Sequence, residues 1–197
     1  MTRIIIIEAP RFINIIREMK PTKFSSSSSL FIICLCLVSY DVVPALGLKL
    51  YENLCSETRK YSQDCLDLLK RDKRIVASEN YHELSVYILD FAIKEAKSYE
   101  VYLVGKAKKF PNDQAVKICA TQLITTTVAA FESSFSDLDK DLQTSIADAV
   151  SAGIGADKCD KAIQNEKPEF DPKPIHTRNN EMLLLSVISV LAINHLT

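Results

Sequence analysis

Four cysteines that follow residue 47 are the side chains of this sequence best suited to chemistry: Cys55, Cys65, Cys119 and Cys159. Residues 1–47 have the pattern of a secretory signal, and an even number of cysteines in an exported domain predicts disulfides. A structural zinc site is the alternative, but no two of these cysteines lie as close in sequence as the ligand pair of such a site requires. We therefore expect two disulfides and no metal.

Other motifs for catalysis or cofactor binding are absent from the sequence. The four glycines match neither G-x-G-x-x-G nor a P-loop, and neither His-Glu-x-x-His nor G-x-S-x-G occurs. None of the three histidines (His82, His176 and His195) has the sequence context of a nucleophile–histidine pair, so we interpret them as solvent-facing polar residues. These absences point away from an enzyme, a catalytic residue or a cofactor.

Composition narrows the class of protein further. The chain has 197 residues, of which 47% are apolar and 25% are charged, and this balance excludes wholesale disorder. The formal net charge of -1 removes a strongly basic nucleic-acid binder from consideration. The length fits one domain.

Residues 1–47 have the organisation of a secretory signal. Leu30–Val38 is an apolar run preceded by lysines and serines, and small residues suited to signal peptidase follow near Ala45 or Gly47. Met19 would be a suitable start for this unit. An uncleaved signal anchor is the alternative, but the run is shorter than the roughly 20 residues that a membrane-spanning helix needs. We expect a secreted, extracellular protein with no stable membrane insertion.

The mature chain, residues 48–197, has the pattern of helices joined by short turns. Apolar residues after Asn80 recur every 3.6 residues or so, which is the period of an α-helix. They are Tyr81, Leu84, Ile88, Ala92, Ala96, Tyr99, Leu103, Ala107 and Phe110. The segment Pro111–Asp113 is expected to end this helix and to cap the next one.

Two further apolar stripes of the same period predict a helical hairpin. They are Val116, Cys119, Leu123, Thr127, Phe131, Phe135 and Leu138, and then Leu142, Ile146, Ala149, Ala152, Ala156, Cys159 and Ile163. The turn between them, 137–141, holds three aspartates but lacks the glycine and closing glutamate of a calcium loop, so we interpret it as a solvated turn. Gly153 and Gly155 weaken the second helix, and we expect its middle to bend.

A proline-rich linker, 167–174, precedes a last helix that we expect Thr177 to cap and that ends near His195. Its apolar run, Met182–Ile193, is too short to span a membrane and predicts the central helix of a bundle core. A lipid-attachment tail is the alternative. The predicted fold class is all-α, an antiparallel four-helix bundle preceded by a short N-terminal helical hairpin.

The helical hairpin predicts how the cysteines pair. Residue 139, in the acidic turn, is the midpoint between Cys119 and Cys159, and both cysteines lie on apolar stripes. Residues at equal distances from the turn of two antiparallel helices lie side by side, so a Cys119–Cys159 bond would join the hairpin at its far end. By elimination, Cys55 pairs with Cys65 and closes a small helix–turn–helix ahead of the bundle.

Two groups of side chains are candidates for contact with a partner. One group is the cations at the end of the first long helix, where the helix dipole already favours them: Lys106, Lys108 and Lys109. The other group is the tyrosines of the same helix, which are mostly core or boundary residues: Tyr81, Tyr87, Tyr99 and Tyr102. A tyrosine off the apolar stripe would serve as an interface anchor.

The cysteine segments resemble those of the plant invertase inhibitor and pectin methylesterase inhibitor family. Leu54–Arg59 is similar to the family's first cysteine segment, and Cys65–Arg74 to its second, in which leucines precede a short Asp-x-Arg turn. Cys119 and Cys159 match the second pair, and Asn179–Leu196 resembles the last helix. The similarity covers essentially the whole mature chain, although the first two cysteines stand one position further apart than is usual.

The resemblance implies a secreted inhibitor of a carbohydrate-active enzyme, pectin methylesterase or acid invertase, located in the apoplast (cell wall) or the vacuole. Invertase-directed members carry a Pro-Lys-Phe tripeptide where this chain has Leu142-Gln143-Thr144. We therefore expect inhibition of pectin methylesterase by steric blockage of its polysaccharide-binding cleft, with inhibition of a cell-wall or vacuolar invertase as the alternative. The resemblance does not identify the contact residues. A non-inhibitory helical carrier or structural protein is a further alternative, which a large apolar cavity would favour.

Overall fold

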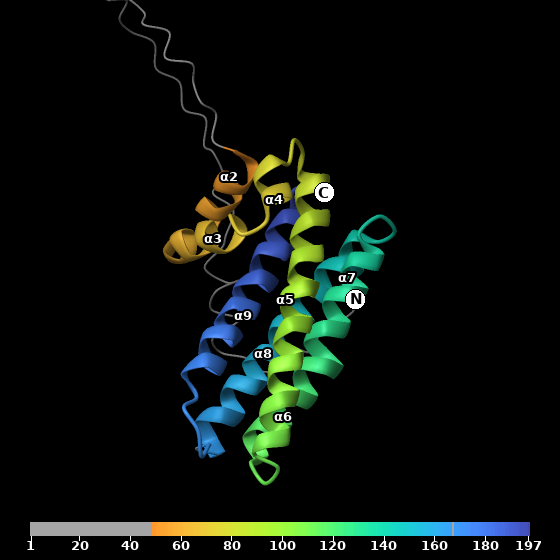
Figure 1. The fold of residues 1–197 in the computed structure, drawn as a ribbon. Coiled ribbons are helices and arrows are strands. Elements are labelled where there is room, and N and C mark those ends of the chain that lie inside the picture. Colours follow the sequence, from red (N-terminus) through yellow and green to blue (C-terminus); the bar gives the residue numbers. More distant parts are fainter. Residues whose placement is uncertain (1–48, 167) are drawn as a thin grey trace, which may run out of the picture.

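The computed structural model describes residues 49–166 and 168–197, and the predicted signal region lies outside them. The described residues form helices and turns and contain no strand. Long helices run side by side along one axis, and short helices gather at one end of them (Figure 1). The predicted all-α class, with a four-helix bundle preceded by an N-terminal helical hairpin, is confirmed.

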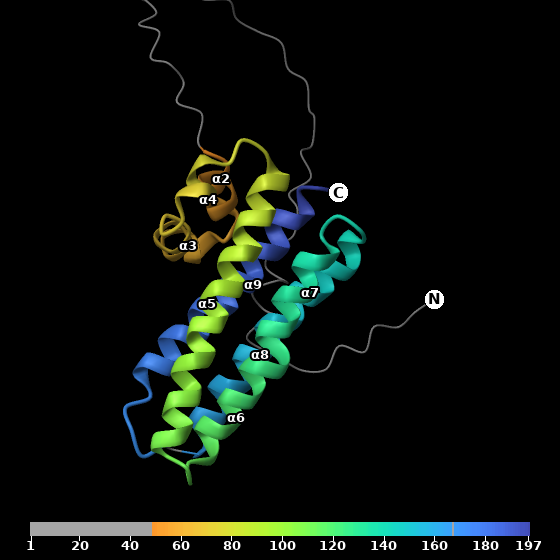
Figure 2. The same cartoon turned by 45° about the vertical axis from the view of Figure 1, so that its right-hand side comes forward.

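Short helices form the N-terminal hairpin and lie at the end of the bundle where the first long helix begins (Figure 2). They are α2 (Leu50–Glu57), η1 (Arg59–Tyr61), α3 (Ser62–Leu69) and α4 (Lys73–Ala77). A disulfide joins Cys55 of α2 to Cys65 of α3, whose Cα atoms are 5.5 Å apart, as predicted. Helix α4 was not predicted from the sequence.

Two arginines fasten the hairpin to the bundle. Arg71 forms a 2.9 Å ion pair with Glu181 in the last helix. Arg74 bridges Asp72, which caps α4, and Asp90 in the first long helix, with 2.7 Å between Arg74 Nη2 and Asp90 Oδ2. These contacts fix the hairpin against the long helices without a covalent link.

The first long helix, α5, spans Tyr81–Lys109 and confirms the predicted apolar stripe. Its N-terminus is capped by Asn80, whose Oδ1 accepts a 2.9 Å hydrogen bond from the backbone N–H of Glu83. Its C-terminus precedes Pro111, which cannot donate the backbone hydrogen bond that a further turn would need. Helix α5 therefore begins and ends where the sequence predicted.

The second long helix is made of α6 (Gln114–Gln122), η2 (Leu123–Val128) and α7 (Ala129–Asp137). Asp113 caps α6 as predicted, because its Oδ1 accepts a 3.0 Å hydrogen bond from the backbone N–H of Val116. The segment η2 is a π-helix, which the sequence analysis did not predict. A π-helical turn widens the helix locally.

The third long helix, α8, spans Leu142–Glu166 and continues across Gly153 and Gly155 without interruption. The irregular segment lies instead in the facing helix, at η2. Gly155 lies against that segment, since an added Cβ would meet Thr127 Oγ1 and come within 3.1 Å of the Thr127 backbone nitrogen. Glycine is required at position 155 because the two helix backbones approach closely there.

The last helix, α9, spans Lys173–Asn194 and begins earlier than predicted. Thr177 does not cap it but lies inside its second turn, and the N-cap is Pro172. Pro174 is compatible with this start because the N–H groups of a first helical turn have no partner within the helix. The expectation that prolines would exclude residues up to 174 from the helix was therefore wrong.

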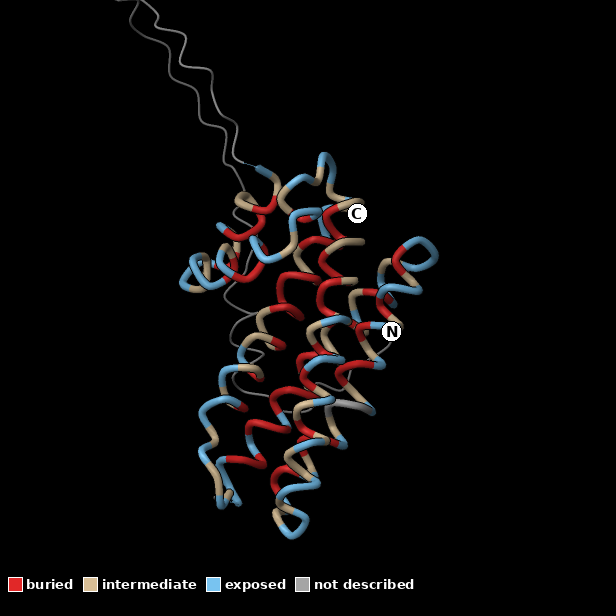
Figure 3. The backbone as a smooth tube through the Cα atoms, in the orientation of Figure 1, coloured by how far each residue is buried: buried red, intermediate tan, exposed pale blue. Residues whose placement is uncertain are grey.

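The core runs the full length of the bundle and continues under the hairpin (Figure 3). Helix α9 packs against α8 and α5, and most of its apolar run Met182–Ile193 is buried, as expected for a helix of the bundle core. The largest fully buried side chains come from the hairpin and from the long helices: Tyr99, Phe131, Leu54, Leu69, Ile75, Leu84, Ile88, Leu89, Leu103, Ile175 and Met182. No helix of the described residues is long and apolar enough to cross a membrane.

Candidate functional site

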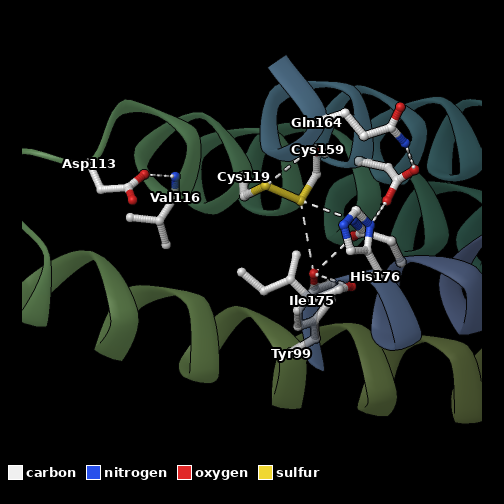
Figure 4. Close-up of a disulfide and its surroundings, with 10 residues drawn as sticks. Tyr99, Asp113, Val116, Cys119, Cys159, Gln164, Ile175 and His176 are labelled. Atoms are coloured by element: carbon white, nitrogen blue, oxygen red, sulfur yellow. Dashed lines mark hydrogen bonds and ion pairs between the residues drawn. A yellow bond between two sulfur atoms is a disulfide. The ribbon is translucent and has the colours of Figure 1, made fainter. Parts of the chain in front are cut away.

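The second disulfide joins Cys119 of α6 to Cys159 of α8, as predicted, with the Cα atoms 4.4 Å apart (Figure 4). Both cysteines are fully buried. The bond ties the two helices together at the end of the hairpin opposite the 137–141 turn. All four cysteines of the described chain are therefore oxidised, which fits a chain that folds in an oxidising compartment.

A buried polar cluster surrounds this disulfide. The hydroxyl oxygen of Tyr99 in α5 lies 2.9 Å from Asn179 Oδ1 and 3.2 Å from the carbonyl oxygen of Ile175, both in α9. Asn179 Nδ2 donates in turn to Cys159 Sγ at 3.2 Å. Tyr99 and Asn179 are fully buried, and this burial raises the pKa of the Tyr99 hydroxyl well above its usual range. Three long helices thus meet at one satisfied polar cluster.

Tyr99 was predicted on the core stripe, whereas the buried position of Asn179 was not predicted. The sequence does mark Asn179 as unusual, because asparagine is a poor helix former and this residue falls within the last predicted helix. Which buried group satisfies its amide could not be inferred, since Tyr99 is 80 positions away in the sequence.

An acid–imidazole pair lies beside the disulfide (Figure 4). His176 Nδ1 in α9 is hydrogen bonded to Asp160 Oδ1 in α8, and Gln164 donates to Asp160 Oδ2 at 2.6 Å. Asp160 is only 6% exposed. A nucleophilic triad needs a hydroxyl or thiol on the other ring nitrogen. Among the described residues no such group is hydrogen bonded to His176, so the visible role of the pair is to join α8 to α9.

The other two histidines also have carboxylate partners. His82 Nε2 lies 2.6 Å from Asp139 Oδ1, across the end of the bundle. His195 Nε2 lies 2.7 Å from Glu57 Oε1, and its ring stacks on Tyr81 with a centroid distance of 4.0 Å. The interpretation of the histidines as solvent-facing missed these partners, because each partner comes from a different helix or turn.

Two of the three aspartates of the 137–141 turn have separate roles. Asp139 pairs with His82, and Asp141 caps α8, because its Oδ1 accepts from the backbone N–H groups of Gln143 and Thr144 at 3.0 and 3.2 Å. The Thr144 hydroxyl bonds the other oxygen of Asp141, and these hydrogen bonds lower the pKa of Asp141. No cluster of metal-ligating side chains occurs in the part of the chain that the structure describes.

The two candidate groups for partner contact take different positions. Lys108 and Lys109 point into solvent at the end of α5, whereas Lys106 is half-buried among aromatic rings. Among the tyrosines, Tyr99 is buried and Tyr102 is half-buried beside Lys106. Tyr87 and Tyr102 both lie off the apolar stripe, and each is half-buried beside a cation, Arg74 for Tyr87 and Lys106 for Tyr102.

Comparison with models of protein families and with curated proteins finds no match to this chain.

Proposed function

We propose that the chain is an exported proteinaceous inhibitor of pectin methylesterase. The observation that carries the proposal is a helical bundle whose long helices are held in register by one disulfide, Cys119–Cys159, and by buried polar contacts. An inhibitor of this kind needs no catalytic group. It needs a rigid surface that fits a cleft, and rigidity before binding limits the entropy lost when the complex forms. The resemblance of the cysteine segments supplies the class of target.

Buried hydroxyls provide much of the locking. Ser134 of α7 and Ser145 of α8 each donate a hydroxyl to the other's carbonyl oxygen at 2.8 Å. Thr127 donates to the carbonyl oxygen of Ala152 at 3.0 Å, and Ser186 of α9 donates to that of Ala149 at 2.6 Å. A sliding motion of α8 would break all of these contacts at once, so the contacts support a surface of fixed shape.

The same interior argues against a carrier of apolar ligands. A ligand-carrying bundle encloses an apolar cavity between its helices. In this bundle large side chains such as Phe131 and Leu103 are fully buried, and the hydrogen-bonded Tyr99–Asn179 cluster lies between α5 and α9. An apolar ligand inserted there would separate polar groups from their partners. These observations support inhibition over carriage.

Helix α8 supports pectin methylesterase over acid invertase as the target. Its first residues, Leu142, Gln143 and Thr144, stand where invertase-directed members of the resembling family carry Pro-Lys-Phe. Gln143 cannot supply the cation of that tripeptide. The adjacent cation, Lys140, lies before the helix and donates to Ser136 Oγ at 3.0 Å.

The mechanism we propose is steric. One face of the bundle would cover the groove in which the enzyme binds its polysaccharide, so that the methyl ester could not reach the reacting groups. The signal region and the disulfides support secretion into the cell wall, where this substrate is located. The vacuole is the location that would instead fit an invertase target.

Titration of both enzymes tests the proposal. The secreted protein with both disulfides formed is added in increasing amounts to pectin methylesterase and to acid invertase at acidic pH, and residual activity is measured. We expect pectin methylesterase to lose its activity near equimolar inhibitor and invertase to keep its activity. Protein that has been reduced and alkylated is the control. Inhibition of invertase alone would reverse the assignment of target, and no effect on either enzyme would refute inhibition.

A further inference from the structure

A cluster of cations and aromatic rings lies where the end of α5 meets the start of α9, at the end of the bundle remote from the N-terminal hairpin (Figures 1 and 2). Its members come from α5, from the segment before α9 and from α9 itself. They are Tyr102, Lys106, Phe110, Phe170 and Arg178, and all five are half-buried. We call this set the cation–aromatic cluster.

Lys106 is surrounded by three rings of the cluster. Its Nζ lies 5.0 Å from the ring centroid of Phe170, 5.6 Å from that of Tyr102 and 5.8 Å from that of Phe110. Phe110 and Phe170 contact each other, with centroids 5.0 Å apart. The backbone N–H of Glu169 reaches Asp113 Oδ2 at 3.4 Å, which helps to hold the segment that carries Phe170.

Arg178 completes the cluster from α9. Its Cζ lies 5.4 Å from the centroid of Tyr102 and 5.6 Å from that of Tyr99. Tyr102 therefore contacts both cations, and the two positive charges are held close to one side chain. A cation placed over an aromatic ring is attracted by the negative face of the ring.

Neither cation of the cluster forms an ion pair with a carboxylate among the described residues. Exposed lysines such as Lys108, Lys117 and Lys158 have no such pair either, so what distinguishes Lys106 and Arg178 is that they are half-buried against aromatic rings. Other cations of the long helices are paired, as in Lys94–Asp90, Lys97–Glu132 and Lys161–Asp157. Asp160, a carboxylate near Tyr99, is hydrogen bonded to His176 and Gln164. Two half-buried cations held by rings alone retain their capacity to bind an anion.

We infer that the cation–aromatic cluster is a binding site for a carboxylated sugar, such as a residue of an acidic polysaccharide. The guanidinium of Arg178 and the ammonium of Lys106 would pair with the sugar carboxylate. The partly accessible rings of Phe110, Phe170 and Tyr102 would pack against the apolar C–H face of the sugar. A protein carboxylate would use the cations but leave that aromatic surface unused. The site does not depend on the proposed inhibition of an enzyme.

Direct binding of sugars to the oxidised protein, with no enzyme present, tests this site. The probes are an unesterified oligogalacturonate, its methyl-esterified form and a neutral malto-oligosaccharide, and binding is measured by calorimetry. We expect the unesterified oligomer alone to bind, with an affinity that falls as salt is added. Equal binding of the esterified or neutral oligomer would overturn a carboxylate site.

Variants locate the site. We expect Lys106→Gln combined with Arg178→Gln to weaken oligogalacturonate binding by about tenfold or more, since two charge-assisted contacts are lost. Tyr102→Leu, which keeps both charges, is expected to weaken it also. Lys108→Gln, an exposed lysine of the same helical turn, is the matched control and should leave the affinity unchanged. Unfolding temperatures verify that each variant is folded.

Two outcomes would refute the inference. If Lys108→Gln weakens binding as much as the double variant Lys106→Gln with Arg178→Gln does, the sugar binds by diffuse charge and not at the cluster. If the wild-type protein binds no oligogalacturonate, the cluster is not a sugar site. Weaker inhibition of an enzyme by Lys106→Gln with Arg178→Gln would then identify the cluster as a protein-contact surface.

Discussion

Gly155 of α8 lies directly against Thr127 of the π-helical segment η2. A Cβ at position 155 would overlap Thr127 Oγ1 and lie within 3.1 Å of both the Thr127 backbone nitrogen and Thr126 Cβ. Thr127 itself is held by its hydrogen bond to the carbonyl oxygen of Ala152. The neighbours of the missing Cβ are therefore a hydrogen-bonded threonine hydroxyl and the backbone behind it, and neither is the end of a flexible side chain.

This contact predicts opposite effects for the same substitution at two glycines. Gly155→Ala should lower the free energy of unfolding by about 1–3 kcal/mol, because α8 must move away from η2. Gly105→Ala should raise it by about 1 kcal/mol, because Gly105 is an exposed glycine inside α5 with nothing within 4 Å of its missing Cβ. Urea unfolding of the two variants measures both effects, and a loss of stability in both would contradict the assigned packing.

Arg59 predicts a stabilising substitution in the N-terminal hairpin. Its φ of 53° places a non-glycine residue in the left-handed region, directly after the end of α2. Arg59→Gly should raise the free energy of unfolding by about 1 kcal/mol, because glycine adopts this conformation without steric cost. Lys60→Gly, in the same short helical turn, is the control and should be destabilising. A loss of stability in Arg59→Gly would mean that the arginine side chain contributes more than its backbone costs.

The helices of the bundle were predictable from the sequence because each signal is local. The apolar stripe that begins at Tyr81, the cap at Asn80 and the break at Pro111 together define α5. The pairing of Cys119 with Cys159 was predictable because the two residues lie at equal distances from the turn. Periodicity and symmetry therefore suffice for the architecture.

The remaining features depend on contacts between distant segments. The apolar stripe of the second long helix continues through Thr127 at the ordinary helical period, so the sequence contains no sign of the π-helical segment η2. Space for this segment is left by Gly155 of the facing helix, which lies far away in the sequence. Tyr102 and Lys106 are recognisable as neighbours one turn apart on α5. That Phe170 and Arg178 join them follows from the packing of α9, which no local pattern encodes.

The two disulfides should contribute unequally to stability. Cys119–Cys159 closes a loop with a sequence separation of 40, and Cys55–Cys65 one with a separation of 10. Loop entropy predicts that replacing Cys119 and Cys159 by serine lowers the free energy of unfolding by about 4 kcal/mol. Replacing Cys55 and Cys65 should lower it by about 3 kcal/mol. Loss of the Cys55–Cys65 bond should also increase hydrogen exchange in α2 and α3 before the bundle opens. Equal exchange in hairpin and bundle would contradict the expectation that this disulfide stabilises the hairpin locally.

Tyr99 predicts a pH dependence on the alkaline side. Burial raises its pKa in the folded state, so the fold favours the protonated hydroxyl. The contribution is fully present below the unfolded pKa of about 10 and is lost as pH rises above it, by at most about 1.4 kcal/mol per pH unit. Tyr99→Phe should be about 1 kcal/mol less stable at neutral pH, because Asn179 loses a partner, and should show a shallower alkaline slope.

A residual alkaline slope is expected in Tyr99→Phe. Burial also raises the pKa of Tyr51 and of Tyr81, so these two hydroxyls contribute to the slope in the same direction. Chemical denaturation at a series of pH values measures the slopes. Identical alkaline slopes in the wild type and in Tyr99→Phe would contradict the buried, hydrogen-bonded position of this hydroxyl.

The central proposal is that the rigid bundle covers the polysaccharide groove of pectin methylesterase. Steady-state kinetics of this enzyme with increasing amounts of the protein test it most directly. Steric coverage predicts that bound inhibitor and polymeric pectin exclude each other, so the apparent KM for pectin should rise with inhibitor while kcat stays constant. A fall in kcat at constant KM would show that the substrate still enters the groove and would contradict the account, as would unchanged kinetics at a large molar excess of the protein.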